Sequence, residues 1–139
     1  METFEHLRRA NTVLLTTRRR DGSAVDTPVN LVVDEQGAGY FRTWSTSGKA
    51  RRLRNFPGVR LAPCSFLGRP QGSDQPAVTS LLSGAEADRA AALLARRYPL
   101  LHGRLVPWIH RIKHQETVHY RVLPADEPTP WHGADDQSG

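Results

Sequence analysis

The feature that most constrains the fold is a β-hairpin signal near the N-terminus. Residues 12–17 and 24–34 are rich in β-branched and aliphatic side chains, and the polar segment between them has Asp21-Gly22 at its tip. Asp-Gly favours a tight hairpin because the turn needs a positive φ, which glycine adopts without strain. The pattern therefore predicts two consecutive antiparallel strands.

Strand signals outnumber helix signals along the rest of the chain. Strands are expected over residues 40–44, 58–66 and 115–123, with an irregular strand or hairpin over 68–84. Short helices are expected over residues 3–9, after a cap at Ser45, Thr46 or Ser47, and over 85–101, while 105–113 can add a further amphipathic turn. The count predicts a mainly β (α+β) domain, a six-stranded antiparallel barrel with two or three peripheral helices.

The length of 139 residues matches one domain. We expect the barrel to occupy residues 1–123, followed over 124–139 by an acidic, proline-rich tail that contains Trp131 and no Lys or Arg. A single cysteine, Cys64, excludes an internal disulfide, and no apolar run suits a signal peptide or a membrane span. These observations favour a cytoplasmic protein, and the small size favours a homodimer.

Positive charge is concentrated in the middle of the chain. The body up to Leu123 carries 19 Lys and Arg against ten Asp and Glu, a net charge of +9. No acid lies between Glu35 and Asp74, where seven cations occur: Arg42, Lys49, Arg51, Arg52, Arg54, Arg60 and Arg69. A solvated basic face is one interpretation. The helix start after Ser47 suggests a phosphate site, because unpaired amides, hydroxyls and Lys49 would meet there.

The familiar nucleotide-binding and metal-binding motifs are missing. Thr43 stands where a Walker A loop needs glycine, and Ala50 follows Lys49 where that loop needs Ser or Thr. His110 and His114 have the spacing of metal ligands on a helix, but no Cys or paired carboxylate completes the set. No metal site is therefore expected.

The sequence also shows no clear motif for acid–base or nucleophilic catalysis by side chains. Cys64 has no base placed beside it by a motif and is interpreted as a packing residue. Acids in or near hairpin turns are interpreted as solvated: Asp21, Asp26, Asp34 and Glu35. The catalytic residues therefore stay unknown. An anion site without a pair of catalytic side chains indicates either that binding the anion is the function or that a bound cofactor supplies the chemistry.

Four segments together resemble a known family: VLLTTRRRDGSAVDTPVN at 13–30, YFRTWSTSGKARRLRNFPGVRLAPC at 40–64, the helix at 85–101 and ETVHYRV at 116–122. Their succession is similar to the pyridoxamine 5′-phosphate oxidase-like (FMN-binding split-barrel) family. More narrowly, it resembles the actinobacterial branch of oxidoreductases that use the deazaflavin coenzyme F420.

The resemblance implies a split barrel whose cofactor lies between the two subunits of a homodimer. The cofactor ring would meet backbone groups of Pro28, Val29 and Asn30. The phosphate would be held by Thr43, Ser47, Gly48 and Lys49, with Arg42 and Arg52 nearby. A longer anionic tail of the deazaflavin would suit Arg51, Arg54 and Arg60.

The implied reaction is hydride transfer from the reduced deazaflavin to an activated C=C or C=N bond of a small organic substrate. Three aromatic residues could line a pocket for an apolar substrate, although core packing is the commoner role: Trp44, Tyr98 and Trp108.

Two departures from the family leave alternatives open. Flavin oxidases commonly have an arginine on the second strand, where this chain has Asp26-Thr27-Pro28, and Asn30 stands where the deazaflavin branch often has an aromatic residue. FMN is the alternative cofactor, and a non-catalytic cofactor-binding or haem-binding protein is a second alternative. A nucleic-acid binder is the weakest, because the cations gather on one helix instead of alternating with exposed aromatics.

Overall fold

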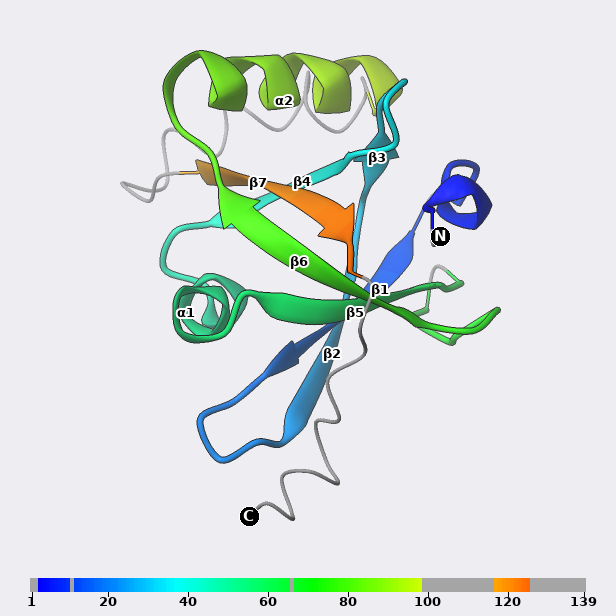
Figure 1. Ribbon diagram of the computed structural model, residues 1–139, viewed down its shortest axis with the longest axis vertical. Helices are drawn as coiled ribbons and strands as arrows, with labels where there is room; N and C mark the ends of the chain where they lie inside the picture. The colour runs from blue at the N-terminus through cyan, green and yellow to red at the C-terminus, as the bar shows by residue number, and fades with distance from the viewer. Residues whose placement is uncertain (1–2, 11, 66, 99–116, 126–139) are drawn as a thin grey trace.

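The computed structural model describes residues 3–10, 12–65, 67–98 and 117–125 (Figure 1). Its elements are η1 (Glu5–Leu7), β1 (Val13–Arg18), β2 (Ala24–Val29), β3 (Val32–Val33), β4 (Gly39–Trp44), α1 (Gly48–Asn55), β5 (Gly58–Pro63), β6 (Gln75–Leu81), α2 (Gly84–Arg97) and β7 (Thr117–Pro124). The turn expected at 105–113, with Trp108, His110 and His114, and the tail from residue 126 lie outside the described residues.

A single antiparallel sheet forms the body of the molecule, in the order β2-β1-β5-β6-β7-β4-β3. The two edge strands, β2 and β3, are separated in the chain by only Asn30 and Leu31. Two residues cannot span a flat sheet of seven strands, so the sheet must curl until its edges approach each other. The result is the curled half-barrel of Figure 1, which confirms the mainly β fold.

The predicted number of six strands was wrong. Residues 24–34 were expected to form one strand, but the structure divides them at Asn30–Leu31 into β2 and β3, which pair with different neighbours. The division has a topological cause, because the chain passes here from one edge of the sheet to the other. Alternation of side chains does not reveal such a change of partner.

The barrel is split along one side. β3 is only two residues long and pairs with Gly39 and Tyr40, so the rest of β4 has no strand beyond it among the described residues. β2 is likewise paired only with β1. From the two-residue link the edges of β2 and β4 diverge, and α1 packs against both β1 and β4 (Figure 1).

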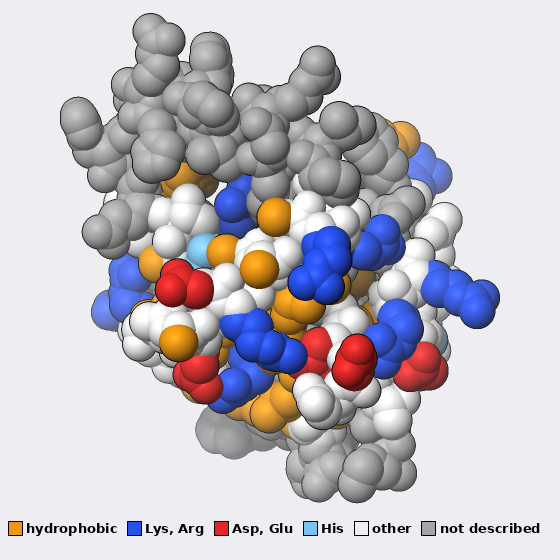
Figure 2. Space-filling view, turned by 90° about the horizontal axis from the view of Figure 1, so that it is seen from above, with side chains coloured by type: hydrophobic (Ala, Val, Ile, Leu, Met, Phe, Trp, Pro, Cys, Tyr) orange, Lys and Arg blue, Asp and Glu red, His pale blue; other side chains and the backbone are white. Residues whose placement is uncertain are grey.

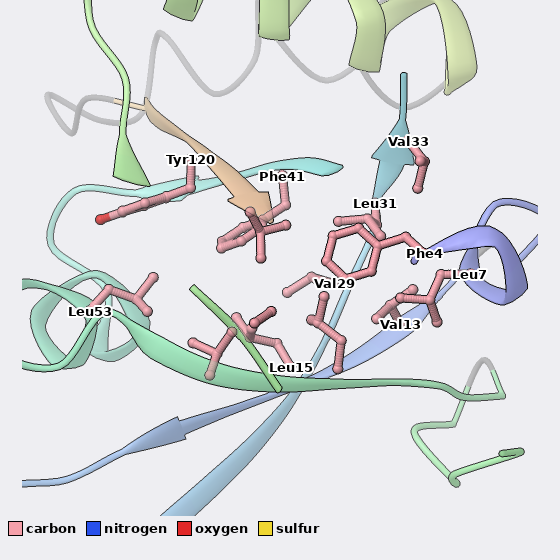
Figure 3. Packing of buried hydrophobic residues seen from close by; sticks show 14 residues of the cluster. Phe4, Leu7, Val13, Leu15, Val29, Leu31, Val33, Phe41, Leu53 and Tyr120 are labelled. Carbon is pink, nitrogen blue, oxygen red and sulfur yellow. The ribbon is translucent and has the colours of Figure 1, made fainter. Parts of the chain in front are cut away.

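Large apolar side chains fill the interior of the barrel. Phe41 and Tyr120, which face each other across β4 and β7, stack with ring centroids 5.3 Å apart. Leu53 of α1 points inward toward Leu15 (Figure 3). Burial of Ala50 and Leu53 therefore holds α1 against the open part of the barrel.

A second, smaller apolar cluster lies on the outer face of the sheet. Ala90 of α2 packs there with Ala38, Tyr40 and Leu82, so α2 covers β4 and its neighbours from outside (Figure 1). Neither described helix has the length and apolar character needed to span a membrane.

Asp34 is not the solvated turn acid that the sequence suggested. Its side chain is 5% exposed and accepts hydrogen bonds from the amides of Ala38 and Gln36 (both 2.9 Å) and from the Tyr40 hydroxyl (3.0 Å). Arg89 of α2 lies 3.6 Å away. Burial raises the pKa of Asp34, but these hydrogen bonds and the Arg89 charge outweigh it and leave the pKa below its usual value.

We predict that Asp34→Ala destabilises the fold, because the buried Ala38 amide and Tyr40 hydroxyl lose their acceptor. The free energy of unfolding should fall by about 2–3 kcal/mol in urea titrations near neutral pH. The pKa of Asp34 is lower in the folded protein than in the unfolded chain. Its contribution to the free energy of unfolding is therefore present above the unfolded-state pKa and is lost as the pH falls through the folded-state pKa. The exposed neighbour Glu35→Ala is the control and should leave stability within about 0.5 kcal/mol.

Candidate functional site

The start of α1 combines hydroxyl groups and backbone amides as the sequence predicted. Ser47 is the N-cap, and its Oγ accepts a hydrogen bond from the Ala50 amide at 3.0 Å. Thr43 at the end of β4 places its Oγ1 3.1 Å from the same Oγ. The hydrogen bonds orient both hydroxyls at the helix start, where the helix dipole favours an anion.

Arg52 completes this arrangement from one turn further along α1. Its Nε donates to Thr17 Oγ1 of β1 at 2.6 Å, which ties the helix to the strand. A Cβ at Gly48 would lie 2.9 Å from Arg52 Nη1, so glycine leaves room for the guanidinium to lie over the first helical residue. The remaining N–H groups of Arg52 therefore lie beside the Gly48 backbone.

The cations at this site repel one another. Burial lowers the pKa of Lys49, and the charge of Arg52 lowers it further. Burial likewise lowers the pKa of Arg52, followed by the charges of Arg19 and Arg51. None of these four side chains has an ion pair with an acid among the described residues. A bound anion would relieve this repulsion, which is the chemistry expected of a phosphate site.

The face that carries α2 differs from the α1 site, because some of its cations pair with acids. It shows basic, acidic and apolar side chains side by side (Figure 2). Arg89 pairs with Asp34 there, and Arg121 lies 3.5 Å from Glu86. Acids of the chain thus neutralise part of the positive charge on this face, whereas no described acid pairs with a cation of α1.

Arg42 does not join the α1 site. Side chains alternate along β4, and Phe41 and Thr43 point to the barrel side, so Arg42 points to the outer face. There it stands directly opposite His119 of β7 and contributes to lowering the pKa of that histidine, after burial, which is the main cause. The Nε2 atom of His119 is buried and makes no hydrogen bond with any described residue.

The predicted ring-contacting residues lie along the edge strand β2 and the link that follows it. Pro28 is exposed on the outer face, Val29 is buried in the core, and Asn30 is half-buried in the link. Proline suits such an edge because no neighbouring strand needs its missing amide hydrogen. The predicted ring contacts therefore lie on β2, along one edge of the split, and the predicted phosphate contacts lie at the end of β4 and the start of α1, along the other edge.

Arg60 is not available as an unpaired cation for a longer anionic tail. Its guanidinium makes two hydrogen bonds to Asp74, at 3.0 and 3.1 Å. Arg51 and Arg54 are exposed on α1. The charge of Arg19, from the β1–β2 turn, acts on Arg52 together with that of Arg51. Arg19 was not among the residues predicted from the sequence, although the run of three arginines at the end of β1 and the start of the turn is the signal that could have indicated it.

The remaining candidates have the following positions. The Tyr98 hydroxyl donates to the Leu31 carbonyl at 2.8 Å, so it ties α2 to the link between β2 and β3. Trp44 is half-buried at the end of β4. Cys64 is buried and burial raises the pKa of its thiol, as suits a packing residue. No group of three or more potential metal ligands occurs among the described residues.

No protein-family model and no curated protein matches this chain. Solved structures do share its fold. The haem storage protein HutZ from Vibrio cholerae is 15% identical with a TM-score of 0.67, each chain being covered to 89%. A candidate pyridoxamine 5′-phosphate oxidase from Listeria innocua is 14% identical with a TM-score of 0.56, and 88% of this chain and 90% of that one are covered.

A third similar structure is Atu2129 from Agrobacterium tumefaciens, a protein of unknown function. It is 20% identical with a TM-score of 0.66 over 93% of this chain, which spans 55% of that protein. The chain therefore has the split-barrel fold found in pyridoxamine 5′-phosphate oxidase-like proteins and in HutZ.

We predict that Lys49→Met raises thermal stability, because it removes a partly desolvated charge that Arg52 repels. The Tm should rise by roughly 2 °C or more in phosphate-free buffer. Inorganic phosphate should raise the Tm of the native protein but have little effect on the variant. A lower Tm for the variant, or an equal response to phosphate, would show that the α1 start is not an anion site.

Proposed function

We propose that the protein is an oxidoreductase that binds the deazaflavin coenzyme F420 at the split of its barrel and reduces a small organic substrate. The observation that carries the proposal is the α1 start, where Lys49, Arg52 and two hydroxyls lie without an acidic partner among the described residues. A cofactor phosphate fits this set of donors, because a helix start, a guanidinium and an ammonium together neutralise its charge.

Five residues would hold the phosphate at the α1 start. Thr43 and Ser47 would offer one free hydroxyl donor, because the hydrogen of the other hydroxyl joins their two oxygens. Lys49 would add a compact charge, and Arg52 the N–H groups that Thr17 does not use. Gly48 would contribute its backbone amide. Arg42, which lies on the other face of β4, is left out of this set.

The ring would lie along the free edge of β2. Either Pro28 or Val29 has its backbone groups directed away from β1, because such groups alternate along a strand, and β2 has no second strand neighbour among the described residues. A bound reduced deazaflavin would supply a hydride to an activated C=C or C=N bond, and the proton that completes the reduction would come from solvent or a nearby hydroxyl. The residues of the chain would bind the phosphate, orient the ring and exclude water from the reacting face.

Asp26 supports deazaflavin over FMN as the cofactor. It occupies the part of β2 where flavin oxidases commonly have an arginine, and its carboxylate accepts a hydrogen bond from Thr16 at 2.7 Å. A carboxylate repels a phosphate placed beside it. A longer anionic tail, as in F420, would in turn suit the exposed cations Arg19, Arg51 and Arg54.

The proposal includes a homodimer. Val78 and Leu123 face each other across β6 and β7 and are each 41% exposed, so the outer face of the sheet offers apolar surface to a second subunit.

A non-catalytic haem-binding role is the second candidate. HutZ is a haem storage protein and shares the fold at a TM-score of 0.67. The pKa of His119 is lowered, mainly by burial, which favours the neutral imidazole, the form that binds iron. Its Nε2 has no hydrogen-bond partner among the described residues, but it is buried and would have to be uncovered to reach iron. Binding of haem without binding of deazaflavin would favour this role.

The decisive experiment is a titration of the purified protein with F420, FMN and haem, followed by fluorescence or absorbance. We expect F420 to bind more tightly than about 100 μM and Lys49→Ala to weaken it by roughly tenfold or more, since a charge-assisted contact is lost. Arg60→Ala is the matched control, because Arg60 is already paired with Asp74. If neither F420 nor FMN binds in that range, the oxidoreductase proposal is wrong.

Affinity should also depend on pH through Lys49. Its pKa in the free protein lies below the ordinary value of 10.5, and a bound anion would raise it. Affinity should therefore be highest while Lys49 is protonated and should fall as the pH rises through its lowered pKa. The arginine of Lys49→Arg keeps its charge at such pH values, so the affinity of this variant should fall less with rising pH. An equally steep fall in the variant would show that another group causes the pH dependence.

A further inference from the structure

Thr17 is a buried polar residue on the barrel side of β1. Its side chain is 0% exposed, and its spacing of two residues from Leu15 places it on the face that lines the interior. A hydroxyl in such a position needs hydrogen-bond partners, because an unpaired polar group inside a protein is costly. The partners of the Thr17 hydroxyl come from two other elements, α1 and β2.

The Thr17 hydroxyl joins α1 to the edge strand of the sheet. Its oxygen accepts the hydrogen bond from Arg52 Nε at 2.6 Å. A hydroxyl has one hydrogen of its own, and Thr17 directs it to the carbonyl of Val25, its partner across β1 and β2, at 3.4 Å. Both roles of the hydroxyl, as acceptor and as donor, are therefore in use.

Two contacts constrain the orientation of the Arg52 guanidinium. Its Nε atom is held by Thr17, and its Nη1 atom lies nearest to Gly48, 2.9 Å from the position that a Cβ would take there. Because the guanidinium is planar and rigid, constraints on Nε and Nη1 also restrict where Nη2 can lie. The terminal N–H groups of Arg52 are thereby kept over the first residue of α1.

Two effects oppose this position of Arg52. The charges of Arg19 and Arg51 repel the guanidinium, and a long side chain loses rotamer freedom when it is held in one place. A hydrogen bond from a charged donor is stronger than one between neutral groups, so the bond to Thr17 counteracts both effects. Without this hydroxyl, we expect Arg52 to turn away from the helix start toward solvent.

We propose that Thr17 is a positioning residue of the phosphate site, which holds the Arg52 guanidinium over the α1 start and so presents its remaining N–H groups to an anion. The proposal rests on the function proposed above, because it takes the α1 start as the place where a cofactor phosphate binds. Thr17 itself would touch neither the phosphate nor the ring. It lies 35 positions before Arg52 in the sequence, so no local motif connects the two residues.

The test measures two affinities in the full-length protein, that for inorganic phosphate from the rise in Tm and that for F420 by titration. Thr17→Val keeps the shape of the side chain but removes the hydroxyl, and it should weaken both affinities by about tenfold. Thr17→Ser keeps the hydroxyl and should restore both to within about twofold of the native values.

Thr79→Val is the matched control. Thr79 is also a buried threonine on the barrel side of the sheet, in β6, and its hydroxyl donates to the Pro57 carbonyl at 2.9 Å. This variant also loses a buried hydroxyl, but one that does not hold Arg52. It should therefore leave both affinities unchanged, even if it lowers the Tm.

A double-mutant cycle shows whether Thr17 acts through Arg52. In the Arg52→Ala background, Thr17→Val should change the phosphate affinity by less than about twofold, because the group that it positions is already missing. A further tenfold loss in that background would assign the effect to the fold instead and would overturn the proposal. Unchanged affinities in the single variant Thr17→Val would also overturn it.

The native protein tests the proposed function separately. If inorganic phosphate raises its Tm but neither F420 nor FMN binds, the proposed function is wrong, and the phosphate measurements on the Thr17 variants still decide the role of Thr17. If inorganic phosphate does not raise its Tm, the α1 start is not an anion site and the positioning role of Thr17 is wrong as well.

Discussion

The two-residue link between β2 and β3 is the constraint on which the rest of the structure depends. Asn30 and Leu31 join the two edges of a seven-stranded sheet, so the sheet must curl, and the curl creates an interior for the apolar core. Because β3 is so short, closure stops after two residue pairs and leaves the edges of β2 and β4 apart. The split is therefore a direct consequence of strand length, and α1 packs beside it.

The packing of α1 links stability to binding at this split. Ala50 and Leu53 bury the inner face of the helix, and the Arg52–Thr17 hydrogen bond fastens it to β1. The same helix holds Lys49, Arg51 and Arg52 near one another with no acidic partner in the described part of the chain, which costs electrostatic free energy in the absence of an anion. An arrangement that is unfavourable alone and favourable with a bound anion is typical of a binding site rather than a structural ion network.

Much of the architecture could be predicted from local patterns. The hairpin of β1 and β2, the cap at Ser47 and the strands β4, β5 and β7 follow from turn chemistry, capping preferences and alternation, which act over a few residues. Each of these signals is complete within its own segment. The structure accordingly confirmed them within a few residues at their ends.

Long-range pairing could not be predicted in this way. Arg60 pairs with Asp74, and Asp34 pairs with Arg89, although the partners are far apart in the sequence and no local pattern links them. The family resemblance implies that Arg42 lies near the phosphate with Thr43, yet alternation along β4 directs the two side chains to opposite faces.

The sequence by itself determined the mainly β character of the chain, its hairpins and the concentration of cations around one short helix, because these are properties of composition and local periodicity. Among the described residues, only the tertiary structure decided which cations stay without an acid and which strand edges stay unpaired. Those outcomes depend on how distant segments meet when the sheet closes.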